Sequence, residues 1–481
     1  MNICLATLHH NPDFTPLSLL YLKAYLVERH GYRSEDIAIR EFPPDAEPDE
    51  IERTILDTDP SIVGLSCYVW NITTLMAIAP RLKAARRDLK IVLGGPEVGP
   101  VAMDVLRRHP AVDVVVKSEG EIPFSELVGQ WSRPAGAIDG VKGISFRNGD
   151  CLVETGEAPE LRDVNHLSSP HLVDFGDPSR RIICVETQRG CVFRCNFCFY
   201  NKDLSIRNRR FDLDRVTGEI AFWLRQGVES IYLMDPIFNL NAERAKAICR
   251  FIVDHNPGPV AFHAEVWAEF IDEELARLMR DANFQFVEVG LQSTDDTALA
   301  TVERRLKVQR FVQGVEQLKR FAIPFELQLI FGLPGETLAT FRKSLNFAAS
   351  LDPPALAVFP LMVLPGTELW RKARDLNLEY DPEPPYQVRS HFSMSADDVA
   401  YGGKIVAGLK RMGDSRTIRL LARERGIRFS DIVDEWIAWC NEQRWPAIVD
   451  PDVKLFVAHF CEKKGIPTEF YRGFASWEFS G

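Results

Sequence analysis

Three closely spaced cysteines follow directly on a segment that is predicted to be a strand. The apolar residues 182–185 are followed within a few positions by Cys191, Cys195 and Cys198, which are separated by three and then two residues. A short loop can wrap one metal cluster only if its sulfur ligands recur every few residues. Three thiolates leave one iron of a four-iron cluster without a protein ligand, and an open position of this kind is where a metal centre binds a substrate or co-substrate. The spacing therefore predicts a 4Fe-4S cluster with chemistry at its free iron.

The residues alone leave two other interpretations of these cysteines open. A structural zinc site would need a fourth ligand such as Cys184, and the thiols could instead pack in a hydrophobic core. The short motifs further along the chain favour the cluster.

Length and charge limit the class of protein. At 481 residues the chain exceeds what one core supports, so two or three domains are expected. The formal net charge of -11 argues against a nucleic-acid or anionic membrane surface, because such binding needs clustered Lys and Arg. The chain has ten cysteines and no secretory signal, and no apolar run is long enough to span a bilayer. These features predict a cytoplasmic protein, and an open cluster would make it sensitive to oxygen. We therefore expect a small-molecule or peptide substrate.

Residues 1–135 alternate strand-like and helix-like segments. Parallel strands with interleaved helices make a doubly wound, Rossmann-like sheet, in which ligands bind beyond the carboxyl ends of the strands. The predicted strands are 3–7, 37–39, 62–66, 91–93 and 112–116, and the predicted helices are 17–28, 77–87 and 101–108.

Residues 181–370 again repeat strand and then helix. About six parallel strands joined by right-handed crossovers predict a partial (β/α)6 barrel, whose active site lies at the carboxyl ends of the strands. The predicted strands are 182–186, 230–234, 261–265, 286–290, 325–331 and 355–363.

The two remaining segments lead into and out of this barrel. Residues 136–180 are expected to be a linker with a small hairpin, because 143–150 alternate like a strand and run into an Asn-Gly turn. Helical patterns occur at 396–411, 415–424 and 429–441. We expect 371–481 to be a mainly helical region that covers the substrate and excludes water, and the alternative is a helical cap that completes a core.

The cysteine loop and the motifs behind it resemble the radical S-adenosylmethionine (SAM) superfamily. Gly290-Leu291-Gln292-Ser293 is similar to its Gly-Val-Glu-Ser segment, residues 332–337 read Gly-Leu-Pro-Gly-Glu-Thr, and Pro365-Gly366-Thr367 is similar to the closure of its last strand. The resemblance implies that the free iron chelates the amino and carboxylate groups of SAM, which is then cleaved reductively.

The same resemblance implies a set of SAM contacts but identifies no catalytic residue. Asp235 stands where the family usually has Gly-Gly-Glu, and a carboxylate can accept hydrogen bonds from the SAM ammonium; the alternative is a helix or turn cap. Glu265 would bind ribose hydroxyls, or it is a surface carboxylate, and Gln292 takes the family's Glu position. Phe197 and Leu333 would border the adenine, or simply pack as apolar residues.

The loops of the N-terminal domain resemble those of the cobalamin-binding domain attached to many radical SAM proteins. Gly94-Gly95-Pro96-Glu97 matches the glycine pair that lets a cofactor tail lie against the backbone, and residues 118–121 match a Gly-Glu-Gly-Glu-like turn, with Ser118 in place of the first Gly. No Asp-x-His-x-x-Gly occurs in the first loop, so that motif supplies no histidine to the cobalt. The implied cobalamin residues are His10, Ser66, Tyr68, Trp70, Gly94, Gly95, Pro96, Glu97 and Glu119. The alternatives are a tight turn at the glycines, aromatic core residues at Tyr68 and Trp70, and a solvated histidine.

Taken together, these resemblances imply a cobalamin-dependent methyltransferase that acts on a small molecule and uses a 4Fe-4S cluster, SAM and cobalamin. A reducing electron donor such as flavodoxin or ferredoxin is expected as partner, and neither a nucleic acid nor a membrane. One alternative is a cobalamin-independent radical SAM enzyme on a vestigial cobalamin fold, which transfers another SAM-derived group, such as 3-amino-3-carboxypropyl, or rearranges its substrate. Another is a binding module, stabilised by zinc or by a cluster, that has no turnover.

Overall fold

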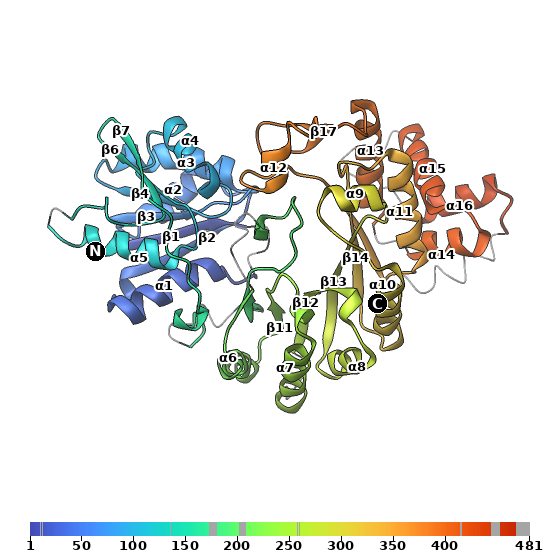
Figure 1. Cartoon of the computed structure of the whole chain (residues 1–481), viewed down its shortest axis with the longest axis horizontal. Helices are drawn as coiled ribbons and strands as arrows, with labels where there is room; N and C mark the ends of the chain where they lie inside the picture. The colour runs from blue at the N-terminus through green and yellow to red at the C-terminus, as the bar shows by residue number, and fades with distance from the viewer. Residues whose placement is uncertain are drawn as a thin grey trace.

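The computed structural model describes residues 1–9, 11, 13–134, 136–172, 180–201, 208–256, 258, 260–413, 416–443 and 453–467. Figure 1 shows an N-terminal α/β domain in blue, a second α/β domain in green and yellow beside it, and helices in orange and red on the far side of the second domain. Both α/β domains expected from the strand patterns are present.

The N-terminal sheet is doubly wound, as predicted. Its strand order is β2-β1-β3-β4-β5-β6-β7, and β1 to β5 pair in parallel. All six residues of β1 (Ile3–Leu8) are buried, as expected of a strand with helices on both faces of its sheet. The order reverses between β1 and β3, where the binding crevice of such a sheet lies. The other parallel strands are β2 (Ile37–Phe42), β3 (Ile62–Ser66), β4 (Lys90–Gly94) and β5 (Val114–Val116), and the helices are α1 (Leu17–His30), α2 (Pro48–Leu56), α3 (Ile72–Ala85), α4 (Ala102–Arg108) and α5 (Glu121–Trp131).

The hairpin expected within a linker extends this sheet instead. β6 (Ile144–Asn148) pairs antiparallel with β5, and β7 (Cys151–Glu154) pairs with β6. Without the hairpin, β5 would expose an apolar edge with unpaired backbone groups, so the hairpin belongs structurally to the N-terminal domain.

The second sheet is the predicted partial barrel of six parallel strands, in the order β15-β14-β13-β12-β11-β8. Alternate residues face opposite sides, so Val287 and Val289 pack against the outer helices while Glu288 belongs to the inner face. The strands are β8 (Ile182–Val185), β11 (Ser230–Leu233), β12 (Ala261–Val266), β13 (Phe284–Gln292), β14 (Phe325–Phe331) and β15 (Ala355–Pro360). The helices are α6 (Leu213–Gln226), α7 (Ala242–His255), α8 (Glu273–Asp281), α9 (Asp296–Thr301), α10 (Val308–Arg320) and α11 (Leu338–Ser350), and a short pair of strands, β9 (Gln188–Arg189) and β10 (Arg209–Arg210), follows β8.

The two domains meet at β8, the edge strand of the barrel. The loop after β1 runs along this edge, where Thr15 Oγ1 donates to the carbonyl of Ile182 at 3.2 Å and accepts from the backbone N of Cys184 at 3.2 Å. One side chain of the N-terminal domain thus satisfies two groups of the strand that leads to the cysteine loop.

The described C-terminal helices pack against the flank of the barrel and complete a core there. α13 (Ala396–Met412) packs against β15 and α15 (Phe429–Glu442) against α11, and Trp436 donates to the carbonyl of Gly408 at 2.9 Å. Trp436 and Trp439 are buried in the same hydrophobic cluster as the barrel strands, because the apolar flank at β15 and α11 needs a cover. Of the two interpretations of this region, the core-completing cap fits the described helices. The remaining elements are α12 (Glu368–Lys372), β16 (Glu379–Tyr380), β17 (Val388–Ser390), α14 (Arg416–Arg425) and α16 (Val453–Lys463).

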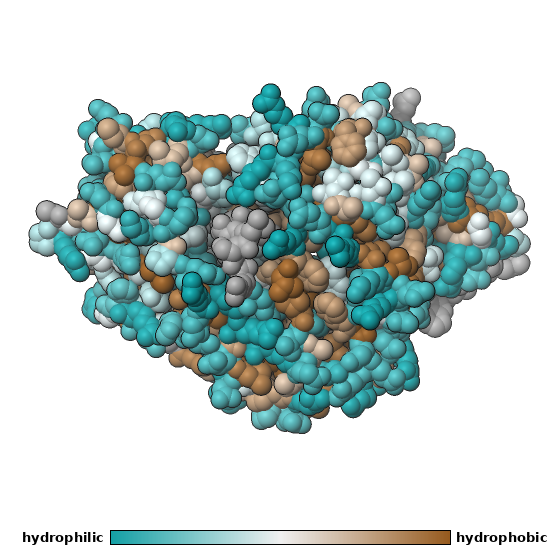
Figure 2. Space-filling view, viewed as in Figure 1, coloured by the Kyte–Doolittle hydropathy of each residue, from teal (hydrophilic) through white to brown (hydrophobic). Residues whose placement is uncertain are grey.

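Hydrophilic residues dominate the visible surface, and hydrophobic residues gather in separate patches (Figure 2). Among the described residues, no helix is both long and apolar enough to cross a bilayer.

Candidate active site

The cysteine loop lies at the carboxyl end of β8, where a barrel carries its active site. Cys195 is buried, and Cys191 and Cys198 are half-buried. Asn196 fixes the loop, because its backbone N donates to Val302 O at 3.1 Å and its Nδ2 donates to Thr301 O at 2.8 Å. The sequence analysis missed Asn196; its only local signal is an amide side chain between two cysteines of the motif.

The surroundings of the cysteines suit thiolate ligands. Burial raises the pKa of Cys198 to about 12, so this thiol ionises at neutral pH only if positive charge compensates it. Arg304 brings positive charge to Cys195, the preceding cysteine of the motif, since its Nη1 lies 3.7 Å from Cys195 Sγ. Its Nη2 donates to Gly290 O at 2.6 Å, and its guanidinium stacks over Trp267 at 4.3 Å. The sequence analysis did not identify Arg304.

The zinc alternative finds no support in the described part of the chain. There, no three side chains of His, Cys, Asp or Glu converge as closely as a single metal ion requires. Cys184, the proposed fourth ligand, is buried within β8. Three cysteines spread along a loop suit a larger inorganic cluster.

Asp235, a predicted SAM contact, is buried and holds the backbone that leads into the cysteine loop. Its Oδ1 accepts from the backbone N of Thr187 at 2.7 Å and of Gln188 at 3.0 Å, and its Oδ2 accepts from Thr187 Oγ1 at 2.5 Å. Burial raises the pKa of Asp235 to about 7, although these three hydrogen bonds favour the ionised form. Its contact with SAM stays a prediction.

Glu265, a second predicted SAM contact, is exposed on the inner face of the barrel. It lies in register with Glu288 on the adjacent strand, and its pKa is raised to about 7 because the surrounding barrel wall partly desolvates the accessible carboxyl and Glu288 adds a like charge. Glu288 is bound by Tyr232 Oη at 2.6 Å and Gln328 Nε2 at 2.7 Å, whereas Glu265 has no hydrogen-bond partner among the described residues. Its carboxylate is therefore available to a ligand hydroxyl.

The other three predicted SAM residues differ in how much they offer a ligand. Gln292 takes a φ of +68°, and its amide folds back over Gly290. Leu333 is fully buried, and Phe197 packs against the cluster that contains it. Leu333 therefore offers a ligand no accessible surface in this structure, and the SAM contacts of these residues stay predictions.

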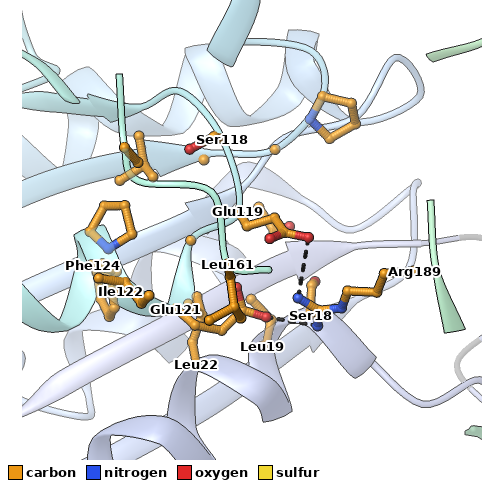
Figure 3. Close-up of a pocket in the computed structure, with 18 of the residues that line it drawn as sticks. Ser18, Leu19, Leu22, Ser118, Glu119, Glu121, Ile122, Phe124, Leu161 and Arg189 are labelled. Atoms are coloured by element: carbon orange, nitrogen blue, oxygen red, sulfur yellow. Dashed lines mark ion pairs between the residues drawn. The ribbon is translucent and has the colours of Figure 1, made fainter. Parts of the chain in front are cut away.

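A cavity of about 520 Å³ extends from the N-terminal domain to the mouth of the barrel. Figure 3 shows its wall of leucines from α1, the turn at Ser118 and Glu119, and Arg189 from the second domain. The cluster loop reaches the same cavity through Gly190, Phe199 and Tyr200. The cofactor-type loops of the first domain and the cysteine loop of the second thus border one space.

Six of the nine predicted cobalamin residues line this cavity, namely Ser66, Tyr68, Gly94, Gly95, Pro96 and Glu119. Trp70 does not line it but stacks on Tyr68, with ring centroids 4.5 Å apart. Glu97 is buried beside the cavity, where it accepts a hydrogen bond from Tyr386. His10 lies outside the described residues.

The glycine pair leaves the space that a cofactor tail would need. A side chain at Gly95, whose φ is +108°, would place its Cβ 2.4 Å from the carbonyl oxygen of Cys67, so only glycine fits there. A Cβ at Gly94 would meet nothing closer than Val116 at 4.0 Å, and Gly94 therefore borders open volume. The cavity continues between the sheet and α1 and α5 along Leu19, Leu22 and Phe124, so an apolar group can lie there. These residues fit a cobalamin.

Two arginines of the barrel domain form ion pairs with glutamates along one wall of the cavity. Arg189 bonds Glu121 at 2.8 Å and lies 3.6 Å from Glu119 (Figure 3), and it also bonds Glu186 at 2.8 Å. Arg209 bonds Glu119 in turn, at 2.6 Å. Burial raises the pKa of Glu186, while the adjacent Arg189 favours its ionised form. Glu119 was predicted to bind cobalamin, and in the structure it also joins the two domains.

Two family models match the chain where these two sites lie. The Radical SAM superfamily model matches residues 185–348, and the B12 binding domain model matches residues 4–128. The chain is a radical SAM protein with a B12-binding domain. This assignment confirms the resemblances of the cysteine loop and of the glycine loop, and an enzyme of this family uses a 4Fe-4S cluster, SAM and cobalamin.

Three methyltransferases are similar to this radical SAM protein. An uncharacterised methyltransferase of Pyrococcus horikoshii, PH0819, is 26% identical over 79% of this chain and 84% of its own length. The cobalamin-dependent radical SAM methyltransferase TokK of Streptomyces tokunonensis is 26% identical over 65% of this chain but 48% of its own length. The structure of the radical SAM methyltransferase TsrM of Kitasatospora setae, with cobalamin and a [4Fe-4S] cluster bound, has a TM-score of 0.64 at 19% identity and covers 80% of this chain and 78% of that one. The likeness to TsrM confirms the fold.

Proposed function

We propose that this radical SAM protein is a cobalamin-dependent methyltransferase that acts on a small-molecule substrate. One observation carries the proposal: Gly94 and Gly95 of the B12-binding domain line the same cavity as Gly190, Phe199 and Tyr200 of the cluster loop. When bound, the cluster supplies reductive cleavage of SAM and cobalamin supplies a methyl group. A substrate held between the two loops would meet both.

The chain's own residues would shape that space and keep water out. Leu19, Leu22 and Phe124 give the cavity an apolar wall, which favours a dry site once it is filled. Arg189 is held by Glu121 and Glu186, so its charge is already paired in the wall. Tyr200 is 48% exposed and lines the cavity, so its phenol is accessible to a bound molecule.

The class of substrate is proposed from the relatives. TsrM has been solved with tryptophan as substrate and a SAM analogue, and a tryptophan 2-C-methyltransferase of Streptomyces laurentii also matches the chain. We propose a small molecule for this chain as well, with a reducing carrier such as flavodoxin or ferredoxin as electron donor. A cytoplasmic location follows from the same proposal, because all ten cysteines are free.

Anaerobic reconstitution with iron, sulfide and cobalamin tests the function. We expect the protein to retain corrinoid and iron after gel filtration, and to form 5'-deoxyadenosine from SAM with a strong reductant. With SAM labelled in its methyl group, label should reach the acceptor when candidate small molecules are supplied. Cys198→Ala should lose iron and SAM cleavage, while Cys151→Ala, at an exposed cysteine outside the motif, should keep both.

Two results would redirect the proposal. Protein that cleaves SAM but retains no corrinoid would favour the cobalamin-independent alternative. Transfer of label from the 3-amino-3-carboxypropyl part of SAM, with none from its methyl group, would favour transfer of that group.

A further inference from the structure

The cluster loop has an inner and an outer face. Gly190 and Phe199 line the cavity, whereas Val192 is 55% exposed and Arg194 is exposed as well. Val192 directly follows Cys191, and Arg194 directly precedes Cys195. Because consecutive Cα atoms are about 3.8 Å apart, each lies next to a cysteine of the motif. The outer face therefore brings solvent-exposed residues to the immediate neighbourhood of the cluster ligands.

The beginning of α10 lies beside this outer face. Phe193 stacks on Trp267, with ring centroids 4.0 Å apart, and Trp267 leads into the short turn Ala268–Phe270. Within that turn, Glu269 Oε1 accepts from the backbone N of Lys307 at 3.0 Å. The cysteine loop, this turn and the residues before α10 therefore form one continuous surface.

This surface carries unpaired positive charge. Arg305, Lys307 and Arg310 are exposed, and within the described chain none of them forms an ion pair, nor does Arg194. Glu303 pairs with Lys372 at 3.0 Å, whereas Glu269 accepts from Lys307 N and keeps its negative charge, so the four cations still outnumber the carboxylate left on this surface. In a chain of formal net charge -11, four free cations beside the cluster loop are a marked local reversal.

Lys307 and Arg310 lie at the amino end of α10, where positive charge is unfavourable to a helix. The amino end of a helix carries partial positive charge and favours acidic side chains. α8 begins with Glu273 and Glu274, whereas α10 has no acidic residue in its first turn, has Arg310 there and has Lys307 as its N-cap residue. Basic residues at this position are unfavourable to the helix itself, which suggests that they serve an anionic partner.

We propose that a small acidic electron-carrier protein docks on this outer face, which consists of Val192, Arg194, Arg305, Lys307, Val308 and Arg310. Val192 and Val308, 55% and 45% exposed, give the surface apolar area, and the four cations attract an acidic carrier. The proposal rests on the proposed function, because a carrier is needed only if the cluster is reduced. In the transfer, one electron leaves the reduced flavin of the carrier, which is oxidised by one electron, and the oxidised cluster is reduced by one.

The test compares two charge-reversal variants of the reconstituted, full-length protein. Arg305→Glu/Lys307→Glu/Arg310→Glu reverses the surface, and acidic residues at the start of α10 should not weaken the helix. Arg87→Glu/Lys343→Glu/Lys404→Glu makes the same change of charge at exposed cations elsewhere on the protein, which form no ion pair with any described residue. Stopped-flow absorbance follows cluster reduction by reduced flavodoxin, and by dithionite as a small reductant.

We expect reversal of the outer face to slow reduction by flavodoxin at least about tenfold at low salt, and to leave reduction by dithionite unchanged. The wild-type rate with flavodoxin should fall as salt rises, and the control variant should match the wild type. Equal flavodoxin rates in all three proteins would overturn the docking surface while leaving the proposed function standing. Failure of every protein to form a cluster would instead overturn both.

Discussion

Arg209 holds Glu119 through two hydrogen bonds, from Nη1 to Oε2 at 2.9 Å and from Nη2 to Oε1 at 2.6 Å. Arg209 belongs to β10 in the barrel domain, and Glu119 follows β5 in the B12-binding domain. The arginine also donates to Leu161 O at 2.8 Å, so one side chain ties both domains and the segment between them at the wall of the cavity.

Removal of this arginine should loosen the two domains. Arg209→Met removes both of these hydrogen bonds from Glu119, and because Glu119 is 34% exposed we expect a loss of about 2 kcal/mol in the free energy of unfolding. Urea unfolding of the apoprotein measures the loss, and gel filtration should show weaker retention of corrinoid. Arg210→Met, at the exposed neighbour, should change neither; equal effects of the two substitutions would contradict the interdomain role.

A second contact between the domains should make stability depend on pH. Tyr386 donates to Glu97 in the glycine loop, and burial raises the pKa of Glu97 to about 7 from 4.5. The folded state therefore binds a proton more tightly than the unfolded state, and Glu97 makes folding less favourable as pH rises from about 4.5 to about 7, with no further change above that.

The matched variant for this pH effect is Glu97→Gln, which keeps a hydrogen-bond acceptor and does not titrate. As pH rises from 5 to 8, we expect the melting temperature of the wild type to fall relative to that of Glu97→Gln. Asp235, Glu265 and Glu336, whose pKa values burial also raises, are common to both proteins and cancel. A difference that does not vary with pH would show that Glu97 is ionised throughout this range.

Local pattern was sufficient for the elements and for the common loop of the three cysteines. β-branched and apolar runs predicted the parallel strands of both sheets, and the spacing of the cysteines predicted their common loop. Both signals are short in sequence, because a strand is defined by a few residues and a loop ligand set by fewer than ten.

The contacts between distant parts of the chain could not be predicted in this way. Asn196 bonds a carbonyl 105 residues away, and Arg209 and Glu119 are 90 residues apart, so no local pattern encodes either pair. The tryptophans of α15 illustrate the same limit: a helical apolar face predicts burial but not the surface against which it packs, and Trp436 packs into the barrel core instead of over the cavity.

The two adjacent glycines should respond differently to alanine. Gly95→Ala should destabilise the domain, because its φ of +108° and the carbonyl of Cys67, 2.4 Å from the added Cβ, exclude a side chain. Gly94→Ala should fold normally but bind cobalamin more weakly, since the added methyl group enters the cavity. Thermal unfolding and corrinoid titration separate the two effects, and Gly403→Ala, where nothing lies within 4 Å of the added Cβ, is the control. Unchanged corrinoid affinity in Gly94→Ala would place the cofactor elsewhere.

Substitution of Asp235 should distinguish a residue that holds the cluster loop from one that binds SAM. Asp235→Asn removes the negative charge that strengthens these hydrogen bonds, and its amide can meet Thr187 Oγ1 only by donating to it instead of accepting from it. If Asp235 mainly holds the loop, iron content should fall, and Thr187→Val, which removes one of the same hydrogen bonds, should reduce it to a smaller extent.

If Asp235 instead binds the SAM ammonium, Asp235→Asn should keep its iron and lose affinity for SAM about tenfold or more, the effect of one charge-assisted hydrogen bond, while Thr187→Val leaves that affinity unchanged. Iron analysis and SAM binding followed by the spectrum of the reduced cluster measure the two quantities separately. Because all described hydrogen-bond partners of Asp235 lie at Thr187 and Gln188, we expect the first result.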